Sequence, residues 1–209
     1  LTAAEIAEAA ADCPVETRDA LTFAAKRIAD FHAEQMPAGL DYKDAAGVRL
    51  GARWNAVAAV GLYVPGGTAP LASTVIMTVV PARAACVDEI YLATPAVGDA
   101  LPHPAVLAAA AIAGADRVFK IGGAQAIAAF AYGTETVRAV DLIVGPGNVW
   151  VTAAKRQLFG RVGIDGLYGP TETLVVADET SDPEFCASDL LAQAEHDVRA
   201  RPILVSTSS

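Results

Sequence analysis

Short apolar runs alternate with alanine-rich segments of helical length along most of this 209-residue sequence. The runs have the length and the β-branched content of buried strands. The expected strands are residues 60–64, 89–93, 117–121, 141–144, 173–177 and 202–206. The expected helices between them are residues 73–86, 104–113, 124–132, 149–159 and 183–196. This alternation predicts parallel sheets with covered faces, the α/β class to which nucleotide-binding folds belong.

An amphipathic helix is expected ahead of this alternation, where apolar residues between Pro14 and Met36 recur at helical spacing. A glycine-rich break at residues 160–170 marks a boundary between two lobes. We therefore expect residues 1–45 to be lead-in helices of a first lobe and residues 46–170 to form a Rossmann-like lobe. Residues 171–209 are expected to form a βαβ unit that returns to the first lobe.

The charge balance and the hydropathy pattern exclude several classes of function. The chain has 15 Lys and Arg against 24 Asp and Glu and no basic run that would bind a polyanion, so nucleic acid is not an expected partner. Its richest apolar stretch, residues 106–113, is much shorter than the ~18 residues of a membrane span, and no signal-like leader precedes it. We expect no membrane association and a cytoplasmic location. Because the sequence starts at Leu1 without a methionine and stops just after an apolar run, we also expect a piece of a longer protein.

The cysteines and two of the histidines favour structural roles. Cys13, Cys86 and Cys186 are odd in number, widely spaced and surrounded by apolar residues, which predicts reduced packing cysteines rather than disulfides or zinc thiolates. His32 and His103 are expected at the surface. None of these residues is therefore a candidate for chemistry.

Three expected strands lead into glycine-rich turns: residues 64–67, 121–125 and 144–148. In a parallel sheet these turns lie at the carboxyl ends of strands, where ligands bind and where glycine lets a ligand approach the backbone. None of the turns is a GxGxxG fingerprint followed by an acidic residue, so each alone is weak evidence for a dinucleotide. Together they predict one shared cofactor cleft.

Gln193 and His196 stand three residues apart near the end of the last expected helix, so their side chains share one face. An amide oxygen and an imidazole nitrogen are both suitable zinc ligands, but zinc usually takes four donors. On spacing alone, the favoured interpretation of His196 is a cation that stabilises the end of a helix.

Four ordered motifs resemble the histidinol dehydrogenase family. They are residues 61–70, beginning Gly-Leu-Tyr-Val-Pro-Gly-Gly; residues 122–128, Gly-Gly-Ala-Gln-Ala-Ile-Ala; Gly145-Pro146-Gly147-Asn148 with the following Ala154-Lys155-Arg156; and Gln193-Ala194-Glu195-His196. The resemblance extends over nearly the whole chain and corresponds to the amino-terminal and middle portions of the family. The carboxyl-terminal half of the family is missing.

The resemblance implies two incomplete Rossmann-like lobes with parallel sheets, as in aldehyde dehydrogenase-like folds, assembled as a homodimer. The implied reaction is the last step of histidine biosynthesis, in which L-histidinol becomes L-histidine through a bound aldehyde and two hydride transfers to NAD. Tyr63, Gln125 and Asn148 match cofactor-contacting positions, which makes residues 46–170 the NAD-binding lobe. Gln193 and His196 match two ligands of Zn2+ and border the substrate.

No acid–base residue can be assigned in this chain. The proton-handling Glu-His pair of the family lies downstream of Ser209, as do the remaining aspartate and histidine zinc ligands. In the family, zinc mainly holds and orients the substrate nitrogens. The resemblance therefore implies an oxidoreductase of which this fragment alone is inactive.

The sequence departs from the family pattern at one place that concerns the substrate. Where the family commonly has Pro-Ala-Gly-Pro-Ser-Glu, this chain has Leu-Tyr-Gly-Pro-Thr-Glu at residues 167–172, so Thr171 replaces a substrate-contacting serine. The added methyl group, with Tyr168 nearby, leaves open a paralogous zinc/NAD dehydrogenase of another small polar alcohol or a diol, such as a sulfonated diol. A non-catalytic ligand-binding α/β module is the alternative from another class. A thiol-dependent aldehyde dehydrogenase is disfavoured by the apolar neighbours of the cysteines.

Overall fold

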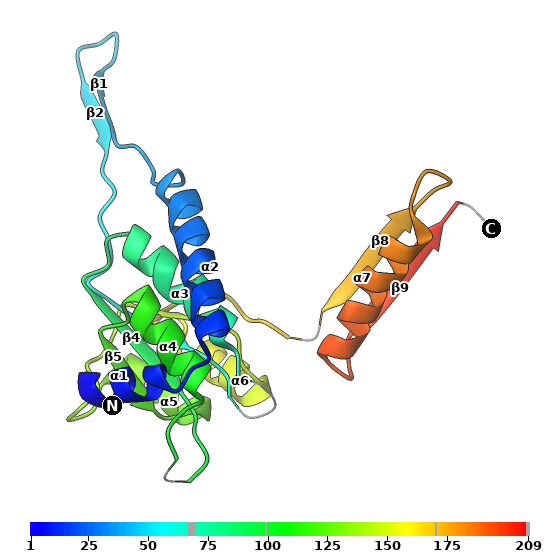
Figure 1. The fold of residues 1–209 in the computed structure, drawn as a ribbon. Helices are drawn as coiled ribbons and strands as arrows, with labels where there is room; N and C mark the ends of the chain where they lie inside the picture. The colour runs from blue at the N-terminus through cyan, green and yellow to red at the C-terminus, as the bar shows by residue number, and fades with distance from the viewer. Residues whose placement is uncertain (67–69, 99, 170, 208–209) are drawn as a thin grey trace. The chain divides into compact units, whose positions relative to one another are not determined.

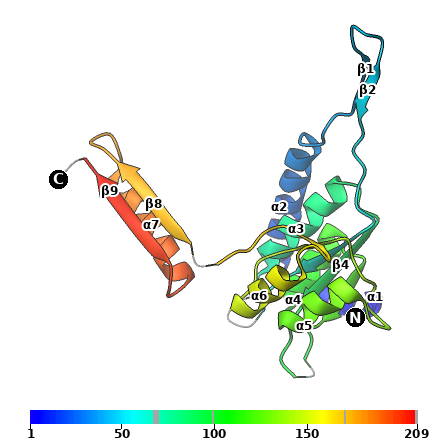
Figure 2. The same cartoon turned by 180° about the vertical axis from the view of Figure 1, so that it is seen from behind.

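The computed structural model describes residues 1–66, 70–98, 100–169 and 171–207 of the chain. These residues belong to two compact units, Leu1–Leu167 and Tyr168–Ser209, each of which is described by itself. Figure 1 labels the helices and strands, and Figure 2 gives the same ribbon from behind. Within the described residues, no helix is both long enough and apolar enough to cross a membrane.

The first unit is built around a five-stranded parallel sheet with the strand order β5-β4-β3-β6-β7. Its strands are β3 (Ala59–Tyr63), β4 (Glu89–Thr94), β5 (Arg117–Lys120), β6 (Leu142–Val144) and β7 (Gly163–Ile164). The chain therefore starts at the centre, moves outward to β5 and returns to pair β6 with the other side of β3. This corresponds to the doubly wound order 3-2-1-4-5 of a Rossmann fold, whose ligand crevice lies where the order reverses, between β3 and β6.

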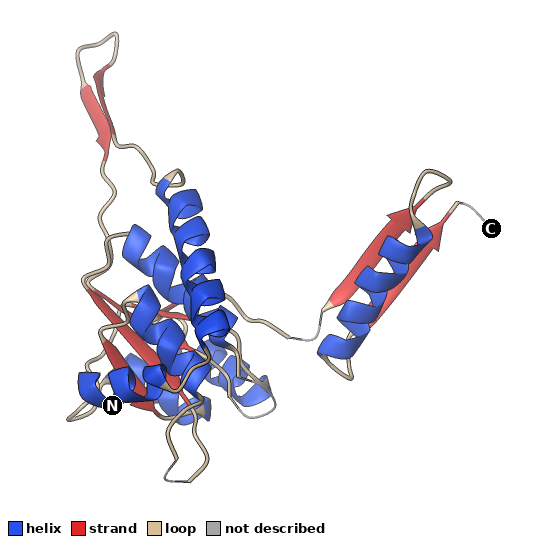
Figure 3. Ribbon diagram, viewed as in Figure 1, coloured by secondary structure: helices blue, strands red, loops and turns tan. Residues whose placement is uncertain are grey.

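Helices cover both faces of this sheet, as Figure 3 shows. Side chains alternate along a strand, so Val60 and Leu62 of β3 join the apolar cluster with α3 (Ala72–Ala84) and α4 (Pro104–Ala113). Tyr63 belongs to the other cluster, together with residues of the neighbouring strands β4 and β6. This cluster also contains residues of α5 (Gly123–Tyr132) and α6 (Val149–Leu158). All of β3 is buried, as the continuous apolar run predicts. The α/β class expected from the sequence is confirmed.

Two leading helices extend the α3–α4 layer. Helix α1 (Ala3–Ala11) starts with a capping box between Thr2 and Glu5, and α2 (Val15–Ala33) follows Pro14. Helix α1 packs against α4, and α2 packs against α3 and α4. This contact puts residues of the expected lead-in segment 1–45 in the same compact unit as the sheet of segment 46–170. The assignment of residues 1–45 to the lobe of residues 171–209 stays a prediction.

An antiparallel hairpin that the sequence analysis did not expect joins α2 to β3. Its strands β1 (Leu40–Lys43) and β2 (Arg49–Ala52) are exposed along their whole length. The side chain of Asp44 closes the turn by accepting hydrogen bonds from the backbone of Ala46 and Val48, both at 2.9 Å. Because no face of the hairpin is buried within the unit, the segment lacks the strong apolar pattern that marked the other strands.

The second unit is a βαβ unit. Strands β8 (Glu172–Ala177) and β9 (Arg201–Ser206) pair in parallel, and α7 (Pro183–His196) packs against both. Asp182 caps α7 by accepting from the backbone N–H of Glu184 at 2.8 Å. Among the described residues of this unit Ala177 alone is buried, so its apolar side chains make almost no core of their own.

The cysteines differ from the expectation in one case. Cys13 is buried and Cys186 is half-buried, but Cys86 is exposed. Cys86 has a φ of 60° directly after α3, which turns the chain out of the helix and leaves the thiol at the surface. The expectation that Cys86 is a packing residue was wrong, because its apolar neighbours in sequence do not surround it in space.

We predict that Gly61→Ala lowers the free energy of unfolding by about 1–3 kcal/mol, because the site is overpacked. A Cβ at Gly61 would lie 2.6 Å from ring atoms of Phe130, and Phe130 is itself 1% exposed. Chemical unfolding measures the loss. Phe130→Leu in the same chain should relieve part of it, so the double variant should lose less than the sum of the single losses. Strict additivity would contradict the steric explanation.

Candidate functional site

Tyr63 ends β3 and connects two of the three glycine-rich turns. Its side chain is 3% exposed and belongs to the apolar cluster beneath α5 and α6. The Tyr63 hydroxyl accepts a hydrogen bond of 3.0 Å from the backbone N–H of Gly123, the first residue of α5. The buried phenol thus fixes the start of α5 relative to the end of β3. Gly67 of the same turn lies outside the described residues.

The second turn brings Gln125 to the first turn of α5. Gly123 has a φ of 65°, a left-handed conformation that glycine adopts without strain. A Cβ at Gly122 would lie 2.6 Å from the Pro95 side chain, so close packing also requires glycine there. Gln125 itself is exposed. Its amide is therefore available at the carboxyl edge of the sheet, beside the amino end of a helix.

The third turn, residues 145–148, leads from β6 into α6. Gly145 has a φ of 124°, and an added Cβ would overlap the carbonyl oxygen of Tyr63. Asn148 caps α6 by accepting hydrogen bonds of 3.1 Å from the backbone N–H groups of Trp150 and Val151. Asn148 is exposed, like Gln125. The turn is therefore in direct contact with the end of β3 and presents a polar side chain at its tip.

An ion pair between two largely buried side chains contacts the backbone of this third turn. Lys155 of α6 has a side chain that is only 2% exposed, and it pairs with Asp165, whose side chain is 16% exposed although the residue as a whole is exposed. The Lys155 ammonium donates to the Gly145 carbonyl oxygen at 3.0 Å. The Asp165 carboxylate accepts from the Gly145 backbone N–H at 2.8 Å. Both polar groups of one glycine are thereby fixed by charged partners.

The three turns meet at one edge of the sheet. Tyr63 contacts the start of α5 through its hydroxyl and Gly145 through its backbone. The edge therefore gathers polar side chains and two helix amino ends near the switch point between β3 and β6, where backbone N–H groups favour anionic ligands. The cofactor-contact roles of Tyr63, Gln125 and Asn148 stay predictions, and Tyr63 contributes from a buried position.

The expected zinc ligands lie in the last turn of α7, in the second unit. The Thr173 hydroxyl donates to the side-chain oxygen of Gln193 at 2.9 Å, whereas His196 is exposed. Asp197 follows directly, and the backbone N–H of Arg199 lowers the pKa of its carboxyl. Thr171, the expected substrate contact, is exposed just before β8. Pro170 lies outside the described residues.

The described residues do not supply a full donor set for a metal. Across the described ranges, the structure contains no group of three or more His, Cys, Asp and Glu residues that would hold a metal ion. Gln193 and His196 are donors of the kind that zinc accepts. Their role as ligands of one ion stays a prediction.

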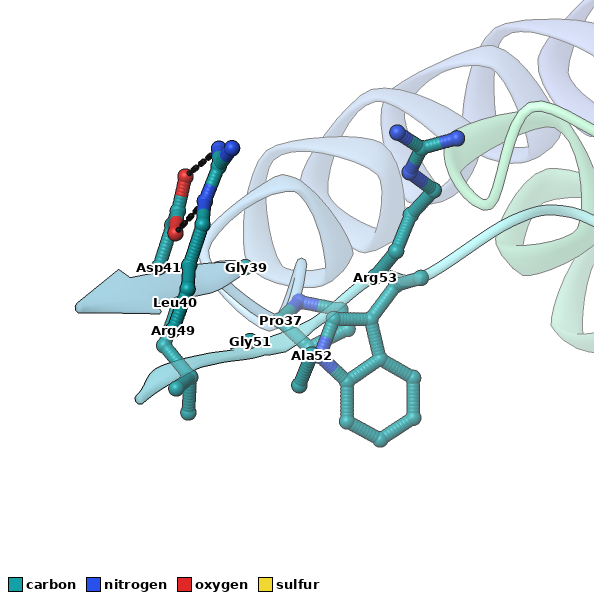
Figure 4. Close-up of a pocket in the computed structure, with 9 residues that line it drawn as sticks. Pro37, Gly39, Leu40, Asp41, Arg49, Gly51, Ala52 and Arg53 are labelled. Atoms are coloured by element: carbon teal, nitrogen blue, oxygen red, sulfur yellow. Dashed lines mark hydrogen bonds and ion pairs between the residues drawn. The ribbon is translucent and has the colours of Figure 1, made fainter. Parts of the chain in front are cut away.

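Two cavities of the first unit involve other residues. One, of about 670 Å³, lies at the base of the hairpin, where Figure 4 shows Asp41 and Arg49 side by side. Arg49 donates to Asp41 through two nitrogens, and this contact lowers the pKa of the Asp41 carboxyl. The other, of about 420 Å³, is an apolar groove beside β3, β6 and α3. Neither combines a nucleophile, a base or a donor set, so the carboxyl edge remains the candidate site.

Sequence reasoning missed Asp165 and Thr173 and gave Lys155 no role. Lys155 stood within a motif that carried the resemblance, but a lysine on a helix normally reads as solvent-exposed. Asp165 lay in the glycine-rich break, where no periodic pattern indicated a short strand such as β7. The pairing of two charges across ten residues is visible only once the sheet is formed.

Comparisons with known proteins agree with this architecture. The family model described as histidinol dehydrogenase matches residues 1–209. Histidinol dehydrogenase of Zymomonas mobilis subsp. mobilis is 53% identical over 208 residues, covering 100% of this chain and 48% of that protein. That of Agrobacterium fabrum is 57% identical over 191 residues, covering 91% of this chain and 44% of that protein.

A solved structure matches the fold of this chain. The crystal structure of histidinol dehydrogenase from Elizabethkingia anophelis matches with a TM-score of 0.95 and 41% sequence identity, covering 100% of this chain and 48% of that one. The chain thus spans about half the length of the relatives it matches. The motifs at the three turns and at the end of α7 agree with a match that runs along the entire sequence, and the chain belongs to the histidinol dehydrogenase family.

Proposed function

We propose that the full-length protein oxidises L-histidinol to L-histidine with NAD, as the last step of histidine biosynthesis. The alcohol carbon loses a hydride and its hydroxyl a proton to give a bound aldehyde. The aldehyde adds a water molecule, and the hydrate then loses a second hydride to a second NAD and two protons to give the carboxylate. The observation that carries the proposal is the joining of three glycine-rich turns at one sheet edge by Tyr63 and Gly145, in a chain more than half identical to named histidinol dehydrogenases.

The cofactor site is proposed at that edge. NAD, when bound, supplies the hydride acceptor. Gln125 and Asn148 have exposed polar side chains at the amino ends of α5 and α6, which suits contact with a dinucleotide at the switch point. Tyr63 is proposed to contact the cofactor as well, from a buried position, and its hydroxyl, which is bonded to Gly123, also keeps α5 in place.

The metal site is proposed on α7. Zinc, when bound, supplies a Lewis acid that orients the nitrogen atoms of the substrate. Gln193 would donate its side-chain oxygen and His196 an imidazole nitrogen. The Thr173 hydroxyl, which donates to the same Gln193 oxygen, keeps that amide turned toward β8. Two donors are half of a tetrahedral set, so the remaining ligands and the acid–base pair are proposed to lie outside these 209 residues.

Substrate choice is proposed to involve Thr171. Its hydroxyl can make the hydrogen bond of a serine, but its methyl group adds bulk, and this favours as second candidate a paralogous dehydrogenase of another small polar alcohol or a sulfonated diol. NADH formation by the full-length protein with L-histidinol and with such diols separates the two. Activity with diols and none with L-histidinol would reject the first candidate.

We further propose that the full-length protein is a cytoplasmic homodimer that binds neither nucleic acid nor membranes.

The 209-residue chain alone is expected to form no NADH with L-histidinol, since it holds neither the proposed acid–base pair nor a full ligand set. Absorbance at the NADH band measures this, with the full-length protein as positive control. Steady turnover by the isolated chain would show that the catalytic groups lie within residues 1–209.

In the full-length protein, His196→Asn should lower zinc affinity by more than about tenfold and turnover with it, because one nitrogen donor is lost. NAD affinity should change little. Metal content, turnover and melting temperature are measured on one preparation, with the exposed Asp189→Asn on the same helix as the control. Full zinc occupancy and unchanged turnover after His196→Asn would show that the ligand assignment is wrong.

A further inference from the structure

The buried side chain of Lys155 has no task in the apolar core. It is 2% exposed, and its cluster of neighbours on that face of the sheet is otherwise aliphatic and aromatic. Burying an ammonium and a carboxylate is costly, and apolar side chains of similar volume often give equal or better stability. A charged pair at this place therefore calls for a role that apolar side chains cannot perform.

The contacts of the pair identify that role. Lys155 donates to the carbonyl oxygen of Gly145 at 3.0 Å, and Asp165 accepts from the N–H of the same residue at 2.8 Å. Gly145 has a φ of 124°, which other residues rarely adopt. The two charged groups thus bond to both the N–H and the C=O of Gly145, the residue at which the chain leaves β6 in an unusual conformation.

Lys155 comes from a helix, and Asp165 comes directly after a short strand. Lys155 lies in the second turn of α6, after the Asn148 cap. Asp165 follows β7, and its own backbone N–H donates to the Ile143 carbonyl of β6 at 3.1 Å. The short strand β7 therefore serves to bring a carboxylate under the turn. The geometry of residues 145–148, and so the placement of Asn148, depends on this pair.

We propose that Lys155 and Asp165 are positioning residues for cofactor binding, which act through the backbone of Gly145 on the turn that carries Asn148. This inference rests on the proposed NAD site. It adds two residues whose proposed effect on the cofactor is indirect, since both side chains bond to the backbone of Gly145.

The test is the double variant Lys155→Met/Asp165→Leu in the full-length protein. Apolar replacement of both partners leaves no buried charge unpaired, but both hydrogen bonds to the buried Gly145 are lost, so the melting temperature should fall while the protein stays folded. NAD affinity should fall by roughly tenfold to a hundredfold, as expected for a misplaced contact. The KM for L-histidinol should stay within about twofold. Arg156→Met, an exposed neighbour on α6, is the matched control and should change neither value.

Should the double variant not fold, Lys155→Met alone is measured at low temperature. The Asp165 side chain retains some exposure, so water can solvate it. NAD affinity equal to that of Arg156→Met overturns the proposal, and so does a loss of NAD affinity accompanied by an equal rise in the KM for L-histidinol. If the unchanged full-length protein binds no NAD, the proposed function fails instead. The two failures are thereby distinguished.

Discussion

The simultaneous pairing of β3 with β4 on one side and β6 on the other determines the rest of the first unit. Because β3 is first in the chain and central in the sheet, the connections diverge from it in opposite directions. The loops after β3 and β6 therefore lead to helices on opposite faces of the sheet, while the ends of the two strands lie side by side. The burial of every residue of β3 explains why the segment contains apolar residues and a single glycine rather than an alternating pattern.

The glycines at this edge serve packing and conformation together. Gly61 lets the Phe130 ring approach the strand, and Gly145 lets the third turn approach Tyr63. The unusual backbone of Gly145 is held by hydrogen bonds to the charged side chains of Lys155 and Asp165. Contacts to the backbone therefore organise this edge of the sheet, and the side chains of Gln125 and Asn148 stay exposed there.

Most of the secondary structure of both units could be predicted from sequence, because the apolar runs and the segments of helical length coincide with its strands and helices. The expected helices 104–113 and 183–196 have the observed bounds, and the expected strands differ from the observed ones by a residue or so. The hairpin was missed because both strands are exposed, and β7 because two residues carry no period. The three turns were placed correctly at strand ends. The support beneath them was not, since Lys155 and Asp165 meet only in the folded chain.

The exposed hairpin has a consequence for how the protein behaves at high concentration. Strands β1 and β2 have free outer edges and side chains such as Leu40 and Tyr42 that are about half exposed, a combination that favours edge-to-edge stacking of hairpins from different molecules. Asp41, Lys43 and Arg49 place charges of both signs along the same ribbon. Arg49 already donates to Asp41, so these two residues are less available to form ion pairs with a neighbouring molecule. The hairpin thus carries its own protection against indiscriminate self-association.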